Sequence, residues 1–482
     1  MFARRPLVAR LSRSRPHRLL HVAAHTLPGA TPSGLAAHLA SHPATPGSAI
    51  LYTLHPDLPE IGALLKVIQS LKVPSVGSIA LSPPGTDPSI SIVQLSPTTS
   101  TEHLTTFHAP ITGRPAVQVG KWQRDPLMHA RKVGAAKREE DRKGEEVGEM
   151  ERVMLGLGAS GGAAEGSGAR VMGWDALWRS GRDVDADGAE PAPRELEGVQ
   201  GVQTMLLLAD GQPDALLRML NTRYPDVQKI GLITYPTPFL TNRPYTLFHN
   251  QSVHEHGAVG IALSGTRQRP HGGVEYPGLR PLGPVETIAQ AQGNLLLRFE
   301  PSSSVAGLTN PTQALIRAIN AFRADSPSSP RPAEAASAAR GISIGKGMKE
   351  EEYYLALWDR DGSEPYQVVK IMSGDPSRGA ISLEMEEPLL SGQKVQFMHK
   401  PTRTAPMSKP DANEIAFTTL PQEEYTAESA AAVYSNVAAQ PGFAAASEGG
   451  FFFADANGQA GRIATGVCNV TGARGFLRFQ AQ

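Results

Sequence analysis

A short unit that occurs twice is the feature that most constrains how this chain folds. Its first copy begins with the apolar run 48–54, which has the length of a strand. Residues 59–71 then place leucine and isoleucine along one helical stripe, and residues 76–81 form a second apolar run. This order predicts a strand, a helix and a strand.

The second copy runs from a strand at 204–209 through a helix beginning at Pro213 to a strand at 229–234. Both copies enter the helix through Asp and Pro, and proline suits the first turn of a helix. Both have a glycine early in the closing strand, Gly77 and Gly231. Coincidence in a leucine-rich chain is the alternative, but the shared Asp and Pro before the helix and the shared glycine in the closing strand favour an internal β–α–β duplication.

The later part of the chain is richer in strands and is predicted to form a second domain. Near-continuous apolar strands beside amphipathic helices are typical of sheets that helices cover on at least one face. We therefore predict a two-domain protein of α/β and α+β class, with mixed sheets covered by helices and domains at 26–300 and 301–482. The second domain is expected to contain helices at 311–322 and 427–438 and strands at 353–358, 367–372, 380–383, 394–398, 450–454, 462–467 and 475–479.

Two segments lack the composition of a packed core. Residues 131–152 are mostly charged and residues 156–169 are nearly all Gly, Ala and Ser, so neither buries enough apolar surface to offset the entropy of ordering. We predict a long disordered insertion over residues 121–199. Residues 325–340, rich in Pro, Ser and Ala, predict a flexible loop.

The first 25 residues have the composition of a mitochondrial targeting segment. They contain six arginines and no acid, and the first acidic residue of the chain is Asp57. We expect import into the mitochondrial matrix, with a cytoplasmic protein carrying a basic tail as the alternative. Equal numbers of basic and acidic side chains, 46 of each, argue against nucleic acid as a partner of the whole chain. No apolar run has the length of a transmembrane segment.

No combination of residues predicts catalysis, a metal ion or a cofactor. His254 and His256 stand two apart in a predicted strand, so their imidazoles would share one face. No third ligand accompanies them, and we interpret them as exposed hairpin residues. Cys468, the only cysteine, is interpreted as a packing residue. Residues 341–347 lack the Ser or Thr that follows Lys in a phosphate-binding loop.

Three further segments carry a pattern of their own. They are TMLLLADGQPDALLRMLNTRYPDVQKIGLITYP from residue 204, LFHNQSVHEHGAVGIALSG from residue 247 and GLRPLGPVETIAQAQGNLLLRFEP from residue 278. Together they resemble the FIST family, a two-domain sensory module, and the third resembles the connector between the two FIST domains. Residues 353–398 resemble the FIST C-terminal domain, but Ala456 stands where the family has a cysteine.

The resemblance implies a non-catalytic sensor for signal transduction, here of a stand-alone, fungal-type member. It implies binding of a small ligand, with amino acids among those proposed for the family, and an output that lies in another protein. Its similarity to this chain covers residues 48–120 and 199–398.

A ligand site is expected where the strands of the two copies end, because ligands of helix-covered sheets usually lie beyond the carboxyl ends of strands. The candidate ligand-binding residues are His55, Asp57, Asp210, Tyr235, Asn250 and Arg280. Among them, Arg280 offers a guanidinium that could clamp a carboxylate with two hydrogen bonds. The alternative for Asp57 and Asp210 is a role in turns or helix caps.

We thus predict a non-catalytic FIST-type sensory protein that binds a small ligand, such as an amino acid or a carboxylate, or a protein partner. Two alternatives remain open. One is a scaffold or adaptor whose charged segment 131–152 recruits a partner, and the other is a hydrolase with a site between its domains.

Overall fold

A computed structural model describes the parts of the chain on which the following account rests. They are residues 20–110, 192–211, 213–266, 269–301, 309–325, 352–358, 365–375, 379–385, 388–400, 409–421, 439–454 and 466–480. Outside them lie most of the predicted insertion 121–199, the predicted helix 427–438, residues 326–340 of the predicted loop 325–340, residues 462–465 of the predicted strand 462–467 and residues 1–19 of the predicted targeting segment. The described residues belong to one compact unit.

The first copy of the repeat lies in a seven-stranded mixed sheet. Its strand order is β19-β1-β4-β2-β3-β8-β9, and only β2 and β3 run parallel. The strands are β1 His21–Pro28, β2 Ala49–Leu54, β3 Ser75–Ile79, β4 Ser89–Ser96, β8 Leu247–His249, β9 Ser252–His254 and β19 Gln440–Pro441. Two helices belong to this part, α1 Pro32–Ser41 and α2 Ile61–Ser70.

The second copy lies in a six-stranded mixed sheet with the order β22-β21-β7-β6-β10-β5, in which only β6 and β7 run parallel. The strands are β5 His103–Ala109, β6 Val202–Ala209, β7 Gln228–Ile233, β10 Ala258–Ser264, β21 Phe451–Ala454 and β22 Val467–Cys468. The helix between the parallel strands is α6 Asp214–Arg223. The short helices η1 Arg194–Leu196 and α7 Pro238–Thr241 flank this region in the sequence.

The predicted duplication extends beyond the β–α–β unit. The order β1-β4-β2-β3-β8 of the first sheet corresponds to β5-β10-β6-β7-β21 of the second, and each pair of neighbours has the same relative direction in both. In each sheet, the two parallel strands therefore lie among antiparallel neighbours in matching positions.

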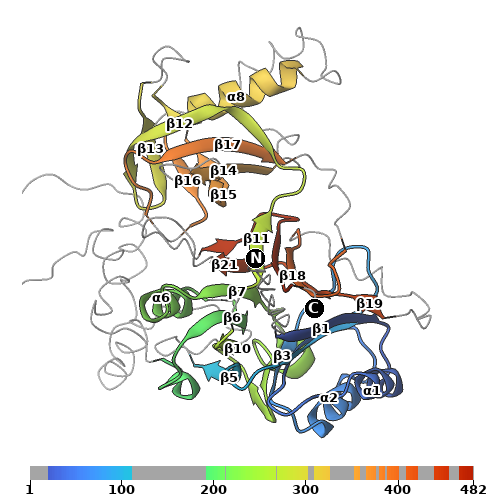
Figure 1. Cartoon of the computed structure of the whole chain (residues 1–482). Helices are drawn as coiled ribbons and strands as arrows, with labels where there is room; N and C mark the ends of the chain where they lie inside the picture. Colours follow the sequence, from blue (N-terminus) through green and yellow to red (C-terminus); the bar gives the residue numbers. More distant parts are fainter. Residues whose placement is uncertain are drawn as a thin grey trace, which may run out of the picture. The chain divides into compact units, whose positions relative to one another are not determined.

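Alternating side chains place these sheets face to face. Leu51 of β2 packs in one core with Leu206 and Leu208 of β6, whereas Ile50 and Tyr52 point to the other side, where α1 and α2 pack. The opposite face of the second sheet, including Leu207, packs against α6. The layers are thus helices, sheet, sheet and helix (Figure 1). The predicted mixed sheets are confirmed, but helices cover only one face of each sheet.

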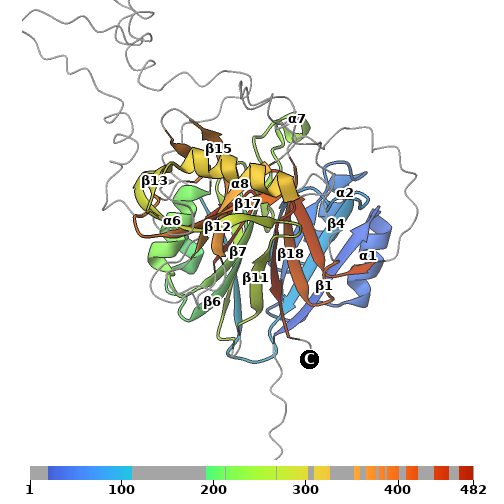
Figure 2. The same ribbon diagram turned by 90° about the horizontal axis from the view of Figure 1, so that it is seen from above.

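Two further strand groups follow in the sequence. A four-stranded sheet has the order β11-β23-β18-β20, and a closed six-stranded barrel has the order β12-β13-β16-β15-β14-β17. The bounds are β11 His271–Glu275, β12 Arg280–Gln292, β13 Leu295–Phe299, β14 Glu352–Trp358, β15 Pro365–Gly374, β16 Ile381–Leu383, β17 Lys394–Lys400, β18 Glu414–Thr419, β20 Phe443–Ser447 and β23 Arg474–Arg478. Helix α8 Pro311–Asp325 lies along β12 and packs Leu315 and Ile319 into the barrel core (Figure 2).

Late segments of the chain complete the early sheets. β19 pairs with β1, and β21 pairs with β7. The predicted domain border at residue 300 stays a prediction, and segments on both sides of it share sheets. Within the described residues there are five α-helices, and none is long and apolar enough to cross a membrane.

Candidate functional site

The predicted strand-end site brings three elements together. His55 directly follows β2, Tyr235 lies two residues beyond β7, and Glu448 directly follows β20. The backbone N–H of Tyr235 donates to the carbonyl of Ile79 at the end of β3, with an N···O distance of 3.1 Å. The neighbouring N–H of Thr234 donates to the carbonyl of Ala209 at the end of β6, at 2.8 Å. The ends of β3, β6 and β7 therefore meet.

His55 is a buried, neutral imidazole in this site. Only 7% of the residue is exposed, and its Nδ1 accepts a hydrogen bond of 3.1 Å from the backbone N–H of Asp57. Because Nδ1 accepts, the ring proton belongs on Nε2. Burial lowers the pKa of His55 to about 4, and the Asp57 carboxylate, 3.9 Å from Nδ1, opposes this shift only in part.

Tyr235 is half-buried and stands close to negative charge. Burial raises the pKa of its phenol, and the carboxylates of Glu448 and Asp57 raise it further. Burial also raises the pKa of Glu448 above its ordinary value. His55, Asp57, Tyr235 and Glu448 form what we call the strand-end cluster. Its two carboxyl groups and its phenol oxygen can accept hydrogen bonds from a cation such as an ammonium group, whereas the acceptor nitrogen of His55 is already used by the N–H of Asp57.

Asp210 holds the backbone at the corner between β6 and β10. Its Oδ2 accepts from the N–H of Gly257 at 2.6 Å, and its own N–H donates to the carbonyl of Gly257 at 2.9 Å. Gly257 has a φ of +92°, and a Cβ there would lie 2.2 Å from the carbonyl oxygen of Ala109. With 1% of its surface exposed, Asp210 is enclosed by protein.

Asn250 and Arg280 are not part of the strand-end cluster. Asn250, at a φ of +54°, accepts from the N–H of Ser75 at 3.0 Å through its side-chain oxygen and donates its own N–H to the carbonyl of Ser75 at 2.7 Å. Ser75 begins β3, whereas Tyr235 bonds to Ile79 at the other end of that strand. Arg280 is exposed at the start of β12, in register with His399 of β17.

The two histidines considered as a chelating pair do not share a strand. β9 ends at His254, so His256 falls outside it, and the carbonyl of His256 lies 3.3 Å from Nε2 of His108. His254 stacks on His108 instead, with ring centroids 3.6 Å apart. Burial and the neighbouring rings of His108 and His249 lower the pKa of His254 to about 4.

Cys468 is a packing residue, as predicted. The thiol is buried in the core between the sheets, and burial raises its pKa to about 12. A thiol of this kind stays protonated near neutral pH and is a poor nucleophile.

Sequence reasoning missed Glu448 and a second group of histidines. Glu448 joins the cluster through β20, which is far away in the sequence and was not predicted. His25, His38 and His42 converge between β1 and α1. The spacing of His38 and His42, four residues apart, would have placed both on one face of a helix had α1 been predicted.

Comparison with known proteins supports one assignment. Residues 133–300 match the family model of the FIST N domain, a sensory, non-catalytic module of signal transduction. The described part of this match includes the second copy of the repeat and the strands β8 to β13. A search of curated proteins finds no match to the chain.

Proposed function

Because the chain belongs to the FIST family through the N domain matched at residues 133–300, we propose that it is a sensor for a small primary amine, amino acids among them. The ligand binds at the strand-end cluster of His55, Asp57, Tyr235 and Glu448. The observation that carries the proposal is that hydrogen-bond acceptors from separate strand ends converge there around a half-buried phenol.

Charge selects the class of ligand. Asp57 and Glu448 bring negative charge to the cluster, and His55 is neutral near pH 7, so an ammonium group is favoured over a carboxylate. The raised pKa of Glu448 reflects a carboxylate that loses hydration without full compensation. A bound ammonium group would supply that compensation and would lower the pKa of Glu448 again.

Thermal-shift screening of the full chain tests this proposal. Primary amines and amino acids should raise the unfolding midpoint, whereas their N-acetylated derivatives and simple carboxylates should not. A ligand present at 100 times its Kd stabilises the protein by about 2.7 kcal/mol, which such a screen detects easily.

Two conservative variants locate the site, and each has a matched control. Tyr235→Phe and Glu448→Gln should abolish the shift. Tyr224→Phe, at another half-buried tyrosine, and Glu286→Gln, at another half-buried glutamate, should leave it unchanged. Equal responses of site and control variants would refute the assignment of the cluster.

We further propose that the protein acts in the mitochondrial matrix, on the basis of the arginine-rich, acid-free composition of residues 1–25. A fluorescent reporter fused behind these residues should enter mitochondria. Exchange of the six arginines for glutamine should leave it in the cytoplasm, and import that survives this exchange would contradict the proposal.

A further inference from the structure

The local fold brings three histidines from two elements to one place. His25 is on β1, on the same face as Leu27, which packs on the helix-covered side of the first sheet. His38 lies in the last turn of α1, and His42 is the C-terminal cap residue of that helix. The buried residues Leu35 and Leu39 fix the rotation of α1 on the sheet. In this orientation, the side of α1 that carries His38 and leads to His42 faces β1.

The short connection between β1 and α1 adds rigidity to this arrangement. Gly29, at a φ of +57°, turns the chain and donates its N–H to the carbonyl of Pro88 at 2.8 Å. Thr31 then caps the helix by accepting from the N–H of Gly34 at 3.2 Å, and Pro32 occupies the first turn. The strand and the helix are therefore held at a defined separation.

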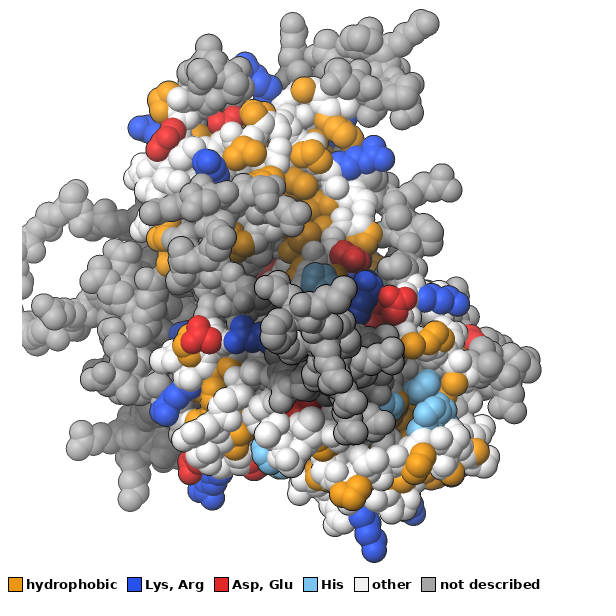
Figure 3. Space-filling view, viewed as in Figure 1, with side chains coloured by type: hydrophobic (Ala, Val, Ile, Leu, Met, Phe, Trp, Pro, Cys, Tyr) orange, Lys and Arg blue, Asp and Glu red, His pale blue; other side chains and the backbone are white. Residues whose placement is uncertain are grey.

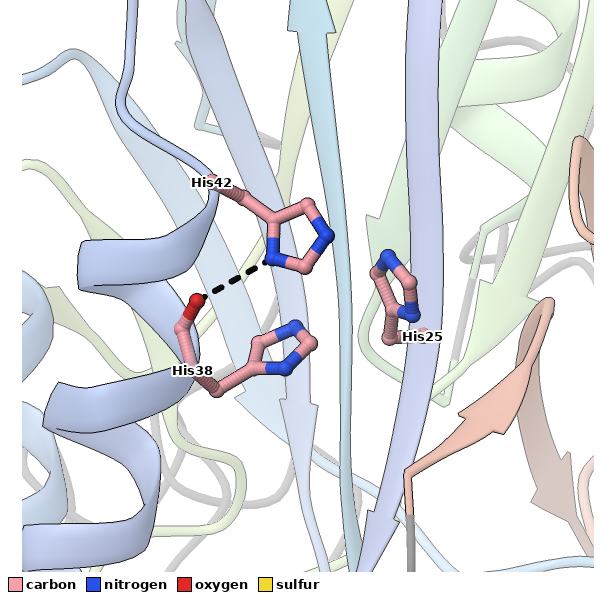
Figure 4. A group of neighbouring side chains, drawn as sticks. All are labelled: His25, His38 and His42. Carbon is pink, nitrogen blue, oxygen red and sulfur yellow. Dashed lines mark hydrogen bonds between the residues drawn. The ribbon is translucent and has the colours of Figure 1, made fainter.

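The three imidazoles form a nearly equilateral triangle. Their ring centroids are separated by 4.6, 4.8 and 4.7 Å, and one nitrogen from each ring lies within 4.8 Å of the other two. The rings turn nitrogen atoms toward the space between them (Figure 4). A tetrahedral ion with bonds of about 2.0–2.1 Å needs its ligand nitrogens about 3.3 Å apart. Binding therefore requires the side chains to rotate until these nitrogens lie closer together.

One hydrogen bond selects the tautomer that a metal requires. Nδ1 of His42 lies 3.1 Å from the carbonyl oxygen of His38 and 3.0 Å from Oγ of Ser41. The Ser41 hydroxyl donates to the same carbonyl at 2.7 Å, so both neighbouring oxygens can accept and Nδ1 is placed to carry the proton. The lone pair is then on Nε2, which is free to ligate. Metal-binding histidines usually donate their other nitrogen to a carbonyl or carboxylate in this way.

The access of the three rings to solvent suits an incoming ion. All three side chains are partly exposed, and histidines gather on the open surface over β1 and α1 (Figure 3). An ion can enter from solvent, and water can fill a fourth position.

We propose that His25, His38 and His42 bind a divalent transition-metal ion, with Zn²⁺ as the best match. Imidazole nitrogen suits Zn²⁺, Cu²⁺ and Ni²⁺, whereas Mg²⁺ and Ca²⁺ prefer oxygen. Three histidines and one water complete the tetrahedral coordination that Zn²⁺ favours. The ion would link β1 to the end of α1, at a site independent of the strand-end cluster.

Direct metal binding to the full-length protein tests the proposal. After chelator treatment and dialysis, the protein should bind one equivalent of Zn²⁺, measured by calorimetry and by elemental analysis. Co²⁺ in the same site should give the intense visible absorption of tetrahedral coordination. His25→Asn, His38→Asn and His42→Asn should each raise the Kd for Zn²⁺ at least about 100-fold and remove the Co²⁺ spectrum.

The other histidine group provides the matched control. His108→Asn and His254→Asn remove imidazoles that also stack with one another, and they should leave Zn²⁺ affinity and the Co²⁺ spectrum unchanged. Circular dichroism checks that each variant is folded, which is expected because the three ligands are only partly buried. No Zn²⁺ binding by the parent protein, or full Zn²⁺ binding by a variant in which His25, His38 and His42 are all replaced by asparagine, would overturn the proposal.

Discussion

Replacement of Gly231 by alanine should destabilise the protein strongly, because an aromatic ring occupies the space of the missing side chain. Gly231 of β7 is the register partner of Phe452 in β21, and a Cβ at Gly231 would lie 2.0 Å from Cζ of Phe452. Carbon atoms normally approach to about 3.5 Å, so the ring would have to retreat by about 1.5 Å. Phe452 is fully buried in the core beneath α6, which leaves no open space for that movement.

The corresponding substitution in the first copy of the repeat, Gly77→Ala, should destabilise the protein for the same reason. Gly77 of β3 is the register partner of Tyr52 in β2, and a Cβ there would lie 2.3 Å from the tyrosine ring. Overpacking of a core costs about 1–3 kcal/mol, and both sites belong at the upper end of that range. Gly62, on the exposed side of α2, is the control, because a Cβ there meets nothing within 4 Å. Gly62→Ala should stabilise the protein by about 0.5–1 kcal/mol.

Urea unfolding, followed by circular dichroism and fluorescence, measures these changes, and a double-mutant cycle tests their cause. Phe452→Leu removes the atoms that a new Cβ would strike. The double variant with Gly231→Ala should then be less destabilised than the sum of the single variants, by at least about 1 kcal/mol. Strict additivity would show that the cost arises from backbone conformation and not from the ring, and would refute the reasoning.

Three other sites give predictions of their own. His55 has a pKa of about 4 in the folded protein, against 6.5 for an exposed histidine. The free energy of unfolding should therefore fall by up to about 3 kcal/mol as the pH drops from 6.5 toward 4. In His55→Asn, this part of the pH dependence should disappear from urea unfolding curves. Glu414→Gln should cost about 3 kcal/mol in the same assay, because Glu414 is fully buried in an ion pair with the buried guanidinium of Arg474. Tyr52→Phe should leave the unfolding free energy unchanged or raise it by about 1 kcal/mol, because the Tyr52 hydroxyl is buried without a partner among the described residues.

The sequence predicts elements well where apolar periodicity and turn residues agree. The strands and the helix of both copies are confirmed, as are α8 and the strands β14 to β17. The leucine and isoleucine stripe of α2 arises from burial of one face of the helix, which is a local property of the chain.

Elements with weaker local patterns were missed. β1 consists largely of alanine and histidine, and α1 has small residues where a helix usually shows a long apolar stripe. Every residue of β18 and β20 is buried, so these strands show no alternation of apolar and polar residues that would mark a strand. Because β1 was not recognised in the sequence, the predicted targeting segment was extended to residue 25, although β1 begins at His21.

The candidate site was predictable only as far as it depends on adjacent strand ends. The two copies of the repeat meet at the ends of their strands. This meeting brings together His55 and Asp57, which follow β2, and Tyr235, which follows β7. Asp210 follows a strand in the same way, but its carboxylate satisfies the N–H of Gly257. A sequence shows that a carboxylate follows a strand, but it does not show which backbone N–H competes for it.

The completed duplication explains why the late strands matter to the region that matches the FIST N domain. The first sheet receives its β8 from the chain that follows the second copy, whereas the corresponding β21 of the second sheet comes from residues 451–454. Without β21, β7 would be an edge strand, and the backbone N–H and C=O groups along that edge of β7 would be unpaired. The space above Gly231, which has no side chain, would be empty. The ring of Phe452 fills that space and the backbone of β21 pairs that edge. The region that matches the FIST N domain and the end of the chain therefore share one sheet, and Glu448, three residues before β21, lies in the strand-end cluster as part of the same late segment.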